Sequence, residues 1–240
     1  GDVIEAGRKQ YRRLLETVQP LFTRQLEKEG WPVAGRLTNA DAFNRFVGPQ
    51  LSDKGRRVAY LMIDALRYEL GVELENRLAE IGAVEIHAAC AQLPTTTLVG
   101  MASLLPNATD ELRLEIESNK LIPKLGEDTA SNVPQRMKVL QKRYGDRFKE
   151  MTLRDFVDKK KLTIDATIDL LVLRSTEIDS QLETNPQDTL SLVPKTLKLI
   201  RAAIAKLRKQ GFHEAVIVSA HGFFLNAQAE AGDVCQKPQG

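Results

Sequence analysis

The chain has 240 residues, of which 42% are hydrophobic and 28% charged, and this is the composition of a globular protein that can bury a core. Its formal net charge of +2 is too small to indicate nucleic-acid binding by itself, and aromatic residues make up only 5% of the chain. No uncharged apolar run approaches the roughly 18 residues of a membrane-spanning helix, and the two cysteines match no zinc or redox spacing, so we expect a cytoplasmic protein without membrane contact.

The first fifty residues are expected to form a helical segment, 1–50, ahead of the main domain. Residues 2–30 carry one apolar stripe among charges, which is typical of an amphipathic helix. The stripe consists of Ile4, Tyr11, Leu14, Leu15, Val18, Phe22 and Leu26. A second, short helix is predicted over 39–47, and the turn-rich stretch 48–57 favours a linker. The main domain should then occupy 51–240.

Strand-like and helix-like stretches alternate through the main domain. The runs with strand character are 58–63, 83–93, 170–175 and 215–219. The helical patterns lie at 66–81, 97–105, 134–144 and 189–210. This alternation predicts an α/β fold, with a mostly parallel sheet sandwiched by helices. The polar segment 107–165 is expected to be an insertion or cap, and its charge run is expected to be a solvated face.

Polar side chains follow the predicted strands at the points where these strands end. Asp64 comes directly after the apolar run "VAYLMI", and Thr97 closes the "PTTT" that follows the second run. Asp179 comes after the third strand, and His221 after the fourth. Ligands of an open parallel sheet bind at the carboxyl ends of its strands, so two carboxylates, a hydroxyl and an imidazole should meet at one edge.

These four side chains have the chemistry of a divalent-metal site. Carboxylate oxygens with one imidazole nitrogen suit zinc or manganese, and a pair of cations can clamp the oxygens of a phosphoryl transfer. A cation beside a threonine hydroxyl would lower the pKa of that hydroxyl and make it a nucleophile. The pattern favours Thr97 as the nucleophile, with Thr96 as the alternative, while Thr95 or Thr96 caps the helix.

The other three residues also have plainer structural interpretations. Asp64 could cap the helix that follows it. Asp179 could belong to the start of a helix, and His221 could be a hydrogen-bonded structural histidine. The metal-site interpretation rests on all of them meeting at one edge of the sheet.

Three motifs, "MIDALRYELG", "LPTTTLVGMASLLP" and "VIVSAHGFF", resemble those of the PglZ family, a branch of the alkaline phosphatase superfamily found in phage-defence loci of the BREX and phage-growth-limitation kind. The resemblance covers about residues 57–230. It implies an alkaline-phosphatase-like core with a dinuclear metal site. It also implies that Arg67, at the position of an arginine in the family, contacts phosphate.

The same resemblance implies a role for each strand-end residue. Asp64 and His221 would hold the cation that activates Thr97, the nucleophile. Asp179 would serve the second cation, together with Glu183 one helical turn further on.

The sequence departs from the family pattern at two points. Relatives carry an Asp-His-Gly triplet after the last strand, whereas this chain has Ala220, His221 and Gly222, so one carboxylate ligand is missing. The superfamily also draws a histidine from a later segment, and neither His87 nor His213 is placed to replace it. We therefore expect a core that is truncated at its C-terminal end.

The expected function is metal-dependent hydrolysis of a phosphoester, as a phosphatase, phosphodiesterase or nuclease of a BREX-type anti-phage system. A nucleic acid or nucleotide is the expected substrate, and other BREX-type defence proteins are the expected partners. The alternative is a non-catalytic, phosphatase-like module that assembles with other defence subunits. Ala220 and the apolar stripe of the N-terminal helix favour this alternative.

Overall fold

The computed structural model describes residues 2–53, 55–184 and 189–223, apart from the side chains of residues 2, 4, 183 and 189–192. Its chain forms two compact units, Gly1–Arg36 and Leu37–Gly240. The first unit contains α1 (Asp2–Glu29), a helix of 28 residues. None of the described helices combines the length and the apolar character that a membrane span requires.

The second unit is built on a four-stranded parallel sheet with the order β5-β6-β1-β7. Its strands are β5 (Phe148–Thr152), β6 (Leu170–Ser175), β1 (Val58–Ile63) and β7 (Glu214–Val218). In the register of the two central strands, Val58 pairs with Leu170 and Ile63 with Ser175. The predicted strands 58–63 and 170–175 are thus confirmed as β1 and β6, and the predicted strand 215–219 is β7, one residue earlier.

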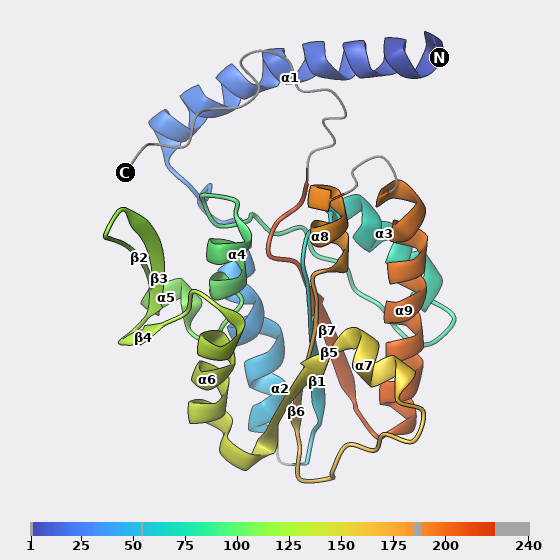
Figure 1. The fold of residues 1–240 in the computed structure, drawn as a ribbon. Helices are drawn as coiled ribbons and strands as arrows, with labels where there is room; N and C mark the ends of the chain where they lie inside the picture. The colour runs from blue at the N-terminus through green and yellow to red at the C-terminus, as the bar shows by residue number, and fades with distance from the viewer. Residues whose placement is uncertain (1, 54, 185–188, 224–240) are drawn as a thin grey trace. The chain divides into compact units, whose positions relative to one another are not determined.

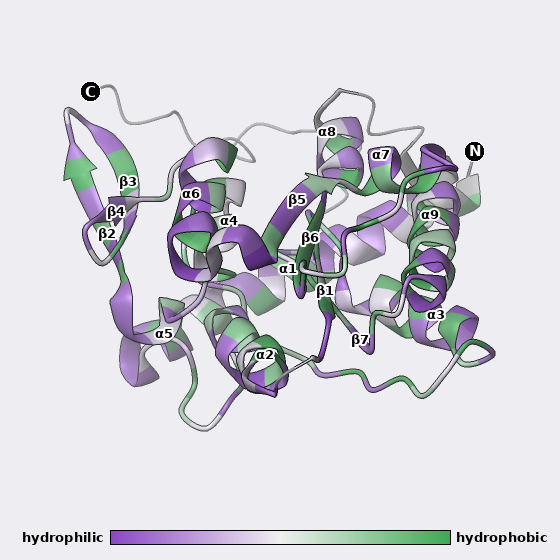
Figure 2. Ribbon diagram, turned by 90° about the horizontal axis from the view of Figure 1, so that it is seen from below, coloured by the Kyte–Doolittle hydropathy of each residue, from purple (hydrophilic) through white to green (hydrophobic). Residues whose placement is uncertain are grey.

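Helices cover both faces of this sheet, as Figure 1 shows. One face is covered by α2 (Gly48–Ser52), α4 (Thr97–Ser103) and α6 (Val133–Tyr144), and the other by α3 (Tyr68–Leu78), α7 (Leu153–Asp158), α8 (Glu177–Thr184) and α9 (Thr189–Lys209). Tyr60 and Met62 of β1 point into the first core, and Leu61 and Ile63 into the second. Figure 2 shows β1 and β6 in the hydrophobic colour between helices of mixed hydropathy. The prediction of an α/β sandwich is confirmed.

The predicted strand at 83–93 is wrong. The structure assigns no strand to this segment and gives it a single bridge, between Thr38 and Cys90. Val84 packs on the core, and the Ile86 Cδ1 atom lies 3.3 Å from the place that a Cβ atom on Gly71 of α3 would take. The alternation of apolar and polar residues in 83–93 therefore indicates an extended segment that packs one face against helix α3, and it does not indicate a strand of the sheet.

The segment 107–165 is an insertion only in part. It begins with α5 (Ala108–Glu111) and an antiparallel sheet of β2 (Leu112–Glu117), β3 (Lys120–Leu125) and β4 (Asp128–Thr129). After α6 and η3 (Gly145–Arg147), however, the chain enters β5, which is an outer strand of the main sheet. The polar sequence "FKEMT" hid this strand, because an edge strand pairs on one side only and tolerates exposed polar residues.

Residues after 36 already belong to the main unit. They form η1 (Asn39–Asp41) and the π turn η2 (Phe43–Val47), which leads into α2. Phe43 is buried, and its ring meets that of Tyr60 edge-on at 5.3 Å. The stretch 48–52, expected to be part of a linker, is helix α2, because its Leu51 is buried in the core between the sheet and the helices of the first face.

Candidate metal centre

The carboxyl ends of three adjacent strands place the predicted residues at one edge of the sheet. Asp64 directly follows β1, Asp179 lies in α8 after β6, and His221 follows β7. Thr97 is the first residue of α4. One ligand atom from each of Asp64, Asp179 and His221 lies within 4.8 Å of the others. The structure thus brings the four side chains together, and the three that could bind a metal, Asp64, Asp179 and His221, lie close to one another.

The contacts within this cluster are direct. The Thr97 Oγ1 atom lies 3.3 Å from Asp179 Oδ2 and 3.1 Å from His221 Nε2. The same His221 nitrogen lies 3.4 Å from Asp64 Oδ1. On the other side of the ring, His221 Nδ1 lies 2.7 Å from the carbonyl oxygen of Gly222, so Nδ1 carries a hydrogen that it donates to this oxygen. The neutral tautomer with its hydrogen on Nδ1 directs the lone pair of Nε2 into the cluster, as metal ligation requires.

Asp64 is the electrostatic centre of the cluster. Its side chain is 0% exposed, and its Oδ2 atom has no hydrogen-bond partner in the part of the chain that the structure describes. Burial raises the pKa of Asp64, and the charge of Asp179 raises it further, while His221, the Thr97 hydroxyl and the Ala65 N–H lower it. An orphaned carboxylate oxygen beside a second carboxylate and an imidazole lone pair is the donor set of a divalent cation, so these residues fit one.

The backbone turns sharply to leave Asp64 in this position. Its N–H group still donates to Ser175 of β6 at 2.8 Å, so Asp64 continues the ladder of the sheet. Ala65 then adopts a left-handed conformation with φ of 57°, and its N–H group donates to Asp64 Oδ1 at 3.1 Å. A non-glycine residue in this region is strained by roughly 1–3 kcal/mol. Such strain occurs where a surrounding structure holds a functional side chain in place.

The threonine run divides into two roles. Thr96 is the N-cap of α4, and its hydroxyl accepts from the Val99 N–H group at 3.5 Å. Thr97 directs its own hydroxyl at the cluster. Capping and a place in the cluster therefore belong to neighbouring residues.

Arg67 lies close to Gly222, next to the cluster, but its side chain contacts Glu69 and Phe223. Its guanidinium donates to Glu69 at 2.6 and 3.1 Å and stacks over the Phe223 ring at 5.2 Å. A phosphate contact by Arg67 would therefore compete with Glu69. The side chain of Glu183, the other predicted metal ligand, lies outside the described residues.

Residue 220 is tightly packed against helix α4. Ala220 is fully buried, and a Cβ atom on Gly100 of α4 would lie 2.6 Å from the Ala220 oxygen. That oxygen also accepts from the buried Asn39 Nδ2 at 2.8 Å. The segment that carries His221 is thus fixed against α4 and η1, an arrangement for which the sequence gives no pattern.

A buried arginine near the cluster was not foreseen. Arg136 in the first turn of α6 is 6% exposed, and its Nη1 donates to Ala130 at 3.2 Å. Burial lowers the pKa of Arg136, and the charge of Asp64 opposes this effect. The signal was its place on the apolar stripe of α6, three residues after Val133 and four before Leu140.

A parallel sheet between helix layers, with such a cluster at its carboxyl edge, defines an α/β domain with a candidate metal centre. A family model described as the BREX system PglZ alkaline phosphatase-like domain matches residues 42–236. The chain belongs to this family.

Two curated relatives support the assignment. The chain is 29% identical over 232 residues to the alkaline phosphatase-like protein PglZ of Bacillus cereus (strain H3081.97), covering 88% of this chain and 25% of the relative. It is 26% identical over 212 residues to the alkaline phosphatase-like protein BrxZ of Escherichia coli O9:H4 (strain HS), covering 87% of this chain and 23% of the relative. The chain thus spans about a quarter of the length of these relatives.

Proposed function

We propose that the chain is the catalytic core of a metal-dependent phosphoester hydrolase that acts in a BREX-type anti-phage system. The observation that carries this proposal is the Thr97 hydroxyl, which lies within 3.3 Å of both Asp179 and His221 and beside the orphaned carboxylate of Asp64. A hydroxyl inside a metal-ligating cluster is the arrangement of an activated nucleophile.

Asp64, Asp179 and His221 would hold a divalent cation, zinc or manganese. When bound, the cation would supply Lewis-acid stabilisation of negative charge and lower the pKa of the Thr97 hydroxyl. Asp179 Oδ2, 3.3 Å from Thr97 Oγ1, would accept the hydroxyl proton as Thr97 Oγ1 forms a bond to phosphorus and the bond to the leaving oxygen breaks. Water would then hydrolyse the phosphothreonine. A second cation, and a phosphate contact by Arg67, remain part of the proposal.

Family membership supports the biological setting. A nucleic acid or nucleotide is the proposed substrate, other BREX-type proteins are the proposed partners, and the cytoplasm is the proposed location. Only the phosphoester chemistry rests on the cluster itself.

The nucleophile is tested by substituting Thr97→Ala in the full-length protein. Turnover of bis-p-nitrophenyl phosphate with zinc or manganese should fall by about a thousandfold or more, because the attacking oxygen is lost. Thr96→Ala is the matched control, which removes a helix cap worth about 1 kcal/mol but leaves Thr97 in place. Equal activity of Thr97→Ala and the unsubstituted protein would exclude Thr97 as nucleophile. Absence of turnover with every divalent ion would remove the hydrolase proposal.

A second candidate is a phosphatase-like assembly module without turnover. Two features favour it: the family resemblance implies a carboxylate where this chain has Ala220, and α1 exposes Leu14, Leu21 and Phe22 by 57%, 54% and 43%. Exposed apolar residues on one helix are typical of an interaction surface.

The assembly module predicts that Leu14→Glu with Leu21→Glu abolishes phage restriction and co-purification with partner subunits, while Thr97→Ala changes neither. The substitutions would put charges on the apolar face. Leu114→Glu, at a residue that is 39% exposed on β2, serves as a control for an added surface charge. Loss of restriction by Thr97→Ala alone would exclude the module.

A further inference from the structure

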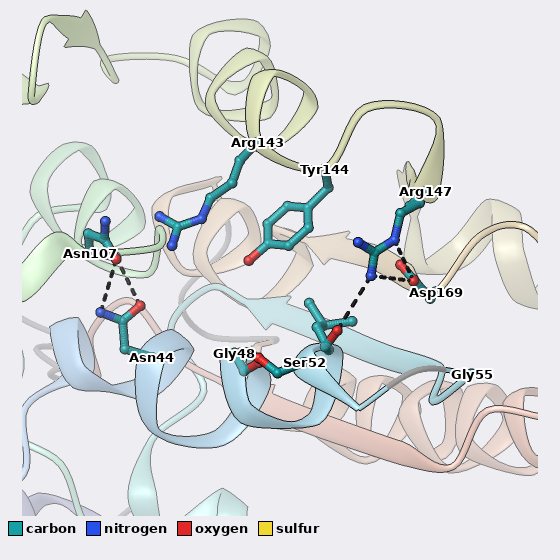
Figure 3. A pocket seen from close by; sticks show the side chains of 10 residues that line it. Asn44, Gly48, Ser52, Gly55, Asn107, Arg143, Tyr144, Arg147 and Asp169 are labelled. Atoms are coloured by element: carbon teal, nitrogen blue, oxygen red, sulfur yellow. Dashed lines mark hydrogen bonds and ion pairs between the residues drawn. The ribbon is translucent and has the colours of Figure 1, made fainter.

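A cavity of about 850 Å³ opens at the edge of the sheet opposite to the metal centre. Its lining includes Arg147 and Asp169, which directly precede β5 and β6, so it lies at the amino ends of the strands. Its other walls come from α2 and from the C-terminal end of α6, as Figure 3 shows. The volume lies within the range of roughly 300–1,000 Å³ typical of small-molecule sites.

One wall of the cavity carries an arginine side chain that has no carboxylate partner within the described part of the chain. Arg143 of α6 makes no ion pair with any residue of the described ranges, and Figure 3 shows it beside Tyr144, both extending from α6 toward α2. Burial raises the pKa of the Tyr144 phenol, while the charge of Arg143 and a hydrogen bond with its side chain partly oppose this shift. Arg147 differs, because it pairs with Asp169 at 2.6 Å. The two arginines and one aspartate give the lining a net positive charge.

The remaining walls are neutral and polar, with one apolar surface. Asn44 Nδ2 donates one hydrogen to Asn107 Oδ1 at 3.2 Å, so the second hydrogen of the Asn44 amide can be donated to a ligand. The Ser52 hydroxyl donates to Gly48 at 3.1 Å, and its oxygen can still accept a hydrogen bond. Leu51 and the Tyr144 ring add surface against which a planar group can pack.

We propose that this cavity binds a small organic phosphate of mononucleotide size, with its phosphate on Arg143 and its ring between Tyr144 and α2. A guanidinium presents a fixed fork of donors that matches phosphate oxygens. The cavity is larger than a lone phosphate requires, and its neutral groups suit a polar ring. The site is separate from the metal centre, and its occupant does not need to be hydrolysed.

Calorimetric titration of the chain with AMP, adenosine and inorganic phosphate, in EDTA, tests the proposal. AMP should bind more tightly than either fragment. Arg143→Gln should weaken AMP binding by about tenfold or more. Lys138→Gln, an equal change of charge at an exposed position of α6 outside the cavity, should alter it less than about twofold. Ser52→Glu adds a competing carboxylate on the opposite wall and should likewise weaken AMP binding by about tenfold or more.

Absence of AMP binding at millimolar concentration would overturn the proposal, as would equal affinity of the Arg143→Gln and Lys138→Gln variants. Binding of phosphate or adenosine as tightly as AMP would overturn the assignment of ligand size. Thermal melting of each variant shows that it is folded. Asp64→Asn, which removes a predicted metal ligand, should leave AMP binding unchanged, so failure here and failure of the hydrolase proposal are distinguishable.

Discussion

Gly100→Ala is expected to destabilise the protein by about 1–3 kcal/mol and to displace the segment that carries His221. The added methyl group would lie 2.6 Å from the Ala220 oxygen and 2.9 Å from its carbonyl carbon. These are backbone atoms of a fully buried residue, held in addition by Asn39, so they cannot rotate away as a side chain would. Unfolding in urea measures the loss of stability, and calorimetry with zinc or manganese should show weaker cation binding.

Gly71→Ala is the matched control, because Gly71 is also inside a helix. Its added methyl group would meet only the Ile86 Cδ1 atom, the end of a side chain, at 3.3 Å. Alanine has a higher helix propensity than glycine by about 1 kcal/mol, so this variant should be as stable as the parent or more so. If the two variants have equal stability, the contact between α4 and the His221 segment is not rigid.

The sequence predicts the central strands well, for a physical reason. β1 and β6 are buried on both faces, so β1 is apolar throughout and β6 is apolar from Leu170 to Leu173, whatever their neighbours are. The strand β5 is an outer strand with polar residues, and 83–93 alternates without pairing. At these two places pairing partners decide the structure, and one segment alone does not contain that information.

The same distinction holds for the candidate site. Asp64, Asp179 and His221 are found by one rule, because side chains at the carboxyl ends of parallel strands face a common edge. Arg136 and Asn39 reach the neighbourhood of this edge through the packing of α6 and η1; the apolar stripe of α6 predicts that Arg136 is buried, but not that it lies near Asp64. The contact between Gly100 and Ala220 likewise joins residues 120 positions apart in the sequence.

Asp64→Asn should stabilise the metal-free protein while abolishing its cation binding. Asparagine has nearly the same shape but carries no charge, and the carboxylate it replaces is 0% exposed with one orphaned oxygen. We expect a gain of about 1–3 kcal/mol at neutral pH from removing this buried carboxylate charge, because one of its oxygens has no partner among the described residues. Affinity for zinc or manganese should fall by about 100-fold or more, with loss of turnover. Urea unfolding in EDTA and metal calorimetry measure the two effects.

The pH dependence of this gain gives a further check. The pKa of Asp64 is raised in the folded state from its ordinary value of 3.8, so the folded protein binds this proton more tightly than the unfolded chain. Its stability therefore falls as the pH rises from 3.8 through the raised pKa, and Asp64→Asn lacks this loss. The difference in stability between the two proteins should be smallest below pH 3.8, grow as the pH rises from 3.8 to the raised pKa, and stay constant above that pKa.

Asp179→Asn separates ligation from burial. Asp179 is only partly buried, so water already screens its charge, and its substitution should raise stability less than Asp64→Asn does. Its carboxylate still contributes to the cluster, so cation affinity should fall in both variants. Two outcomes would exclude a metal centre formed by the three residues. One is a loss of stability in Asp64→Asn. The other is an unchanged cation affinity in both Asp64→Asn and Asp179→Asn. A substitution that raises stability and lowers cation affinity is expected only where the protein keeps a buried charge in order to bind a cation.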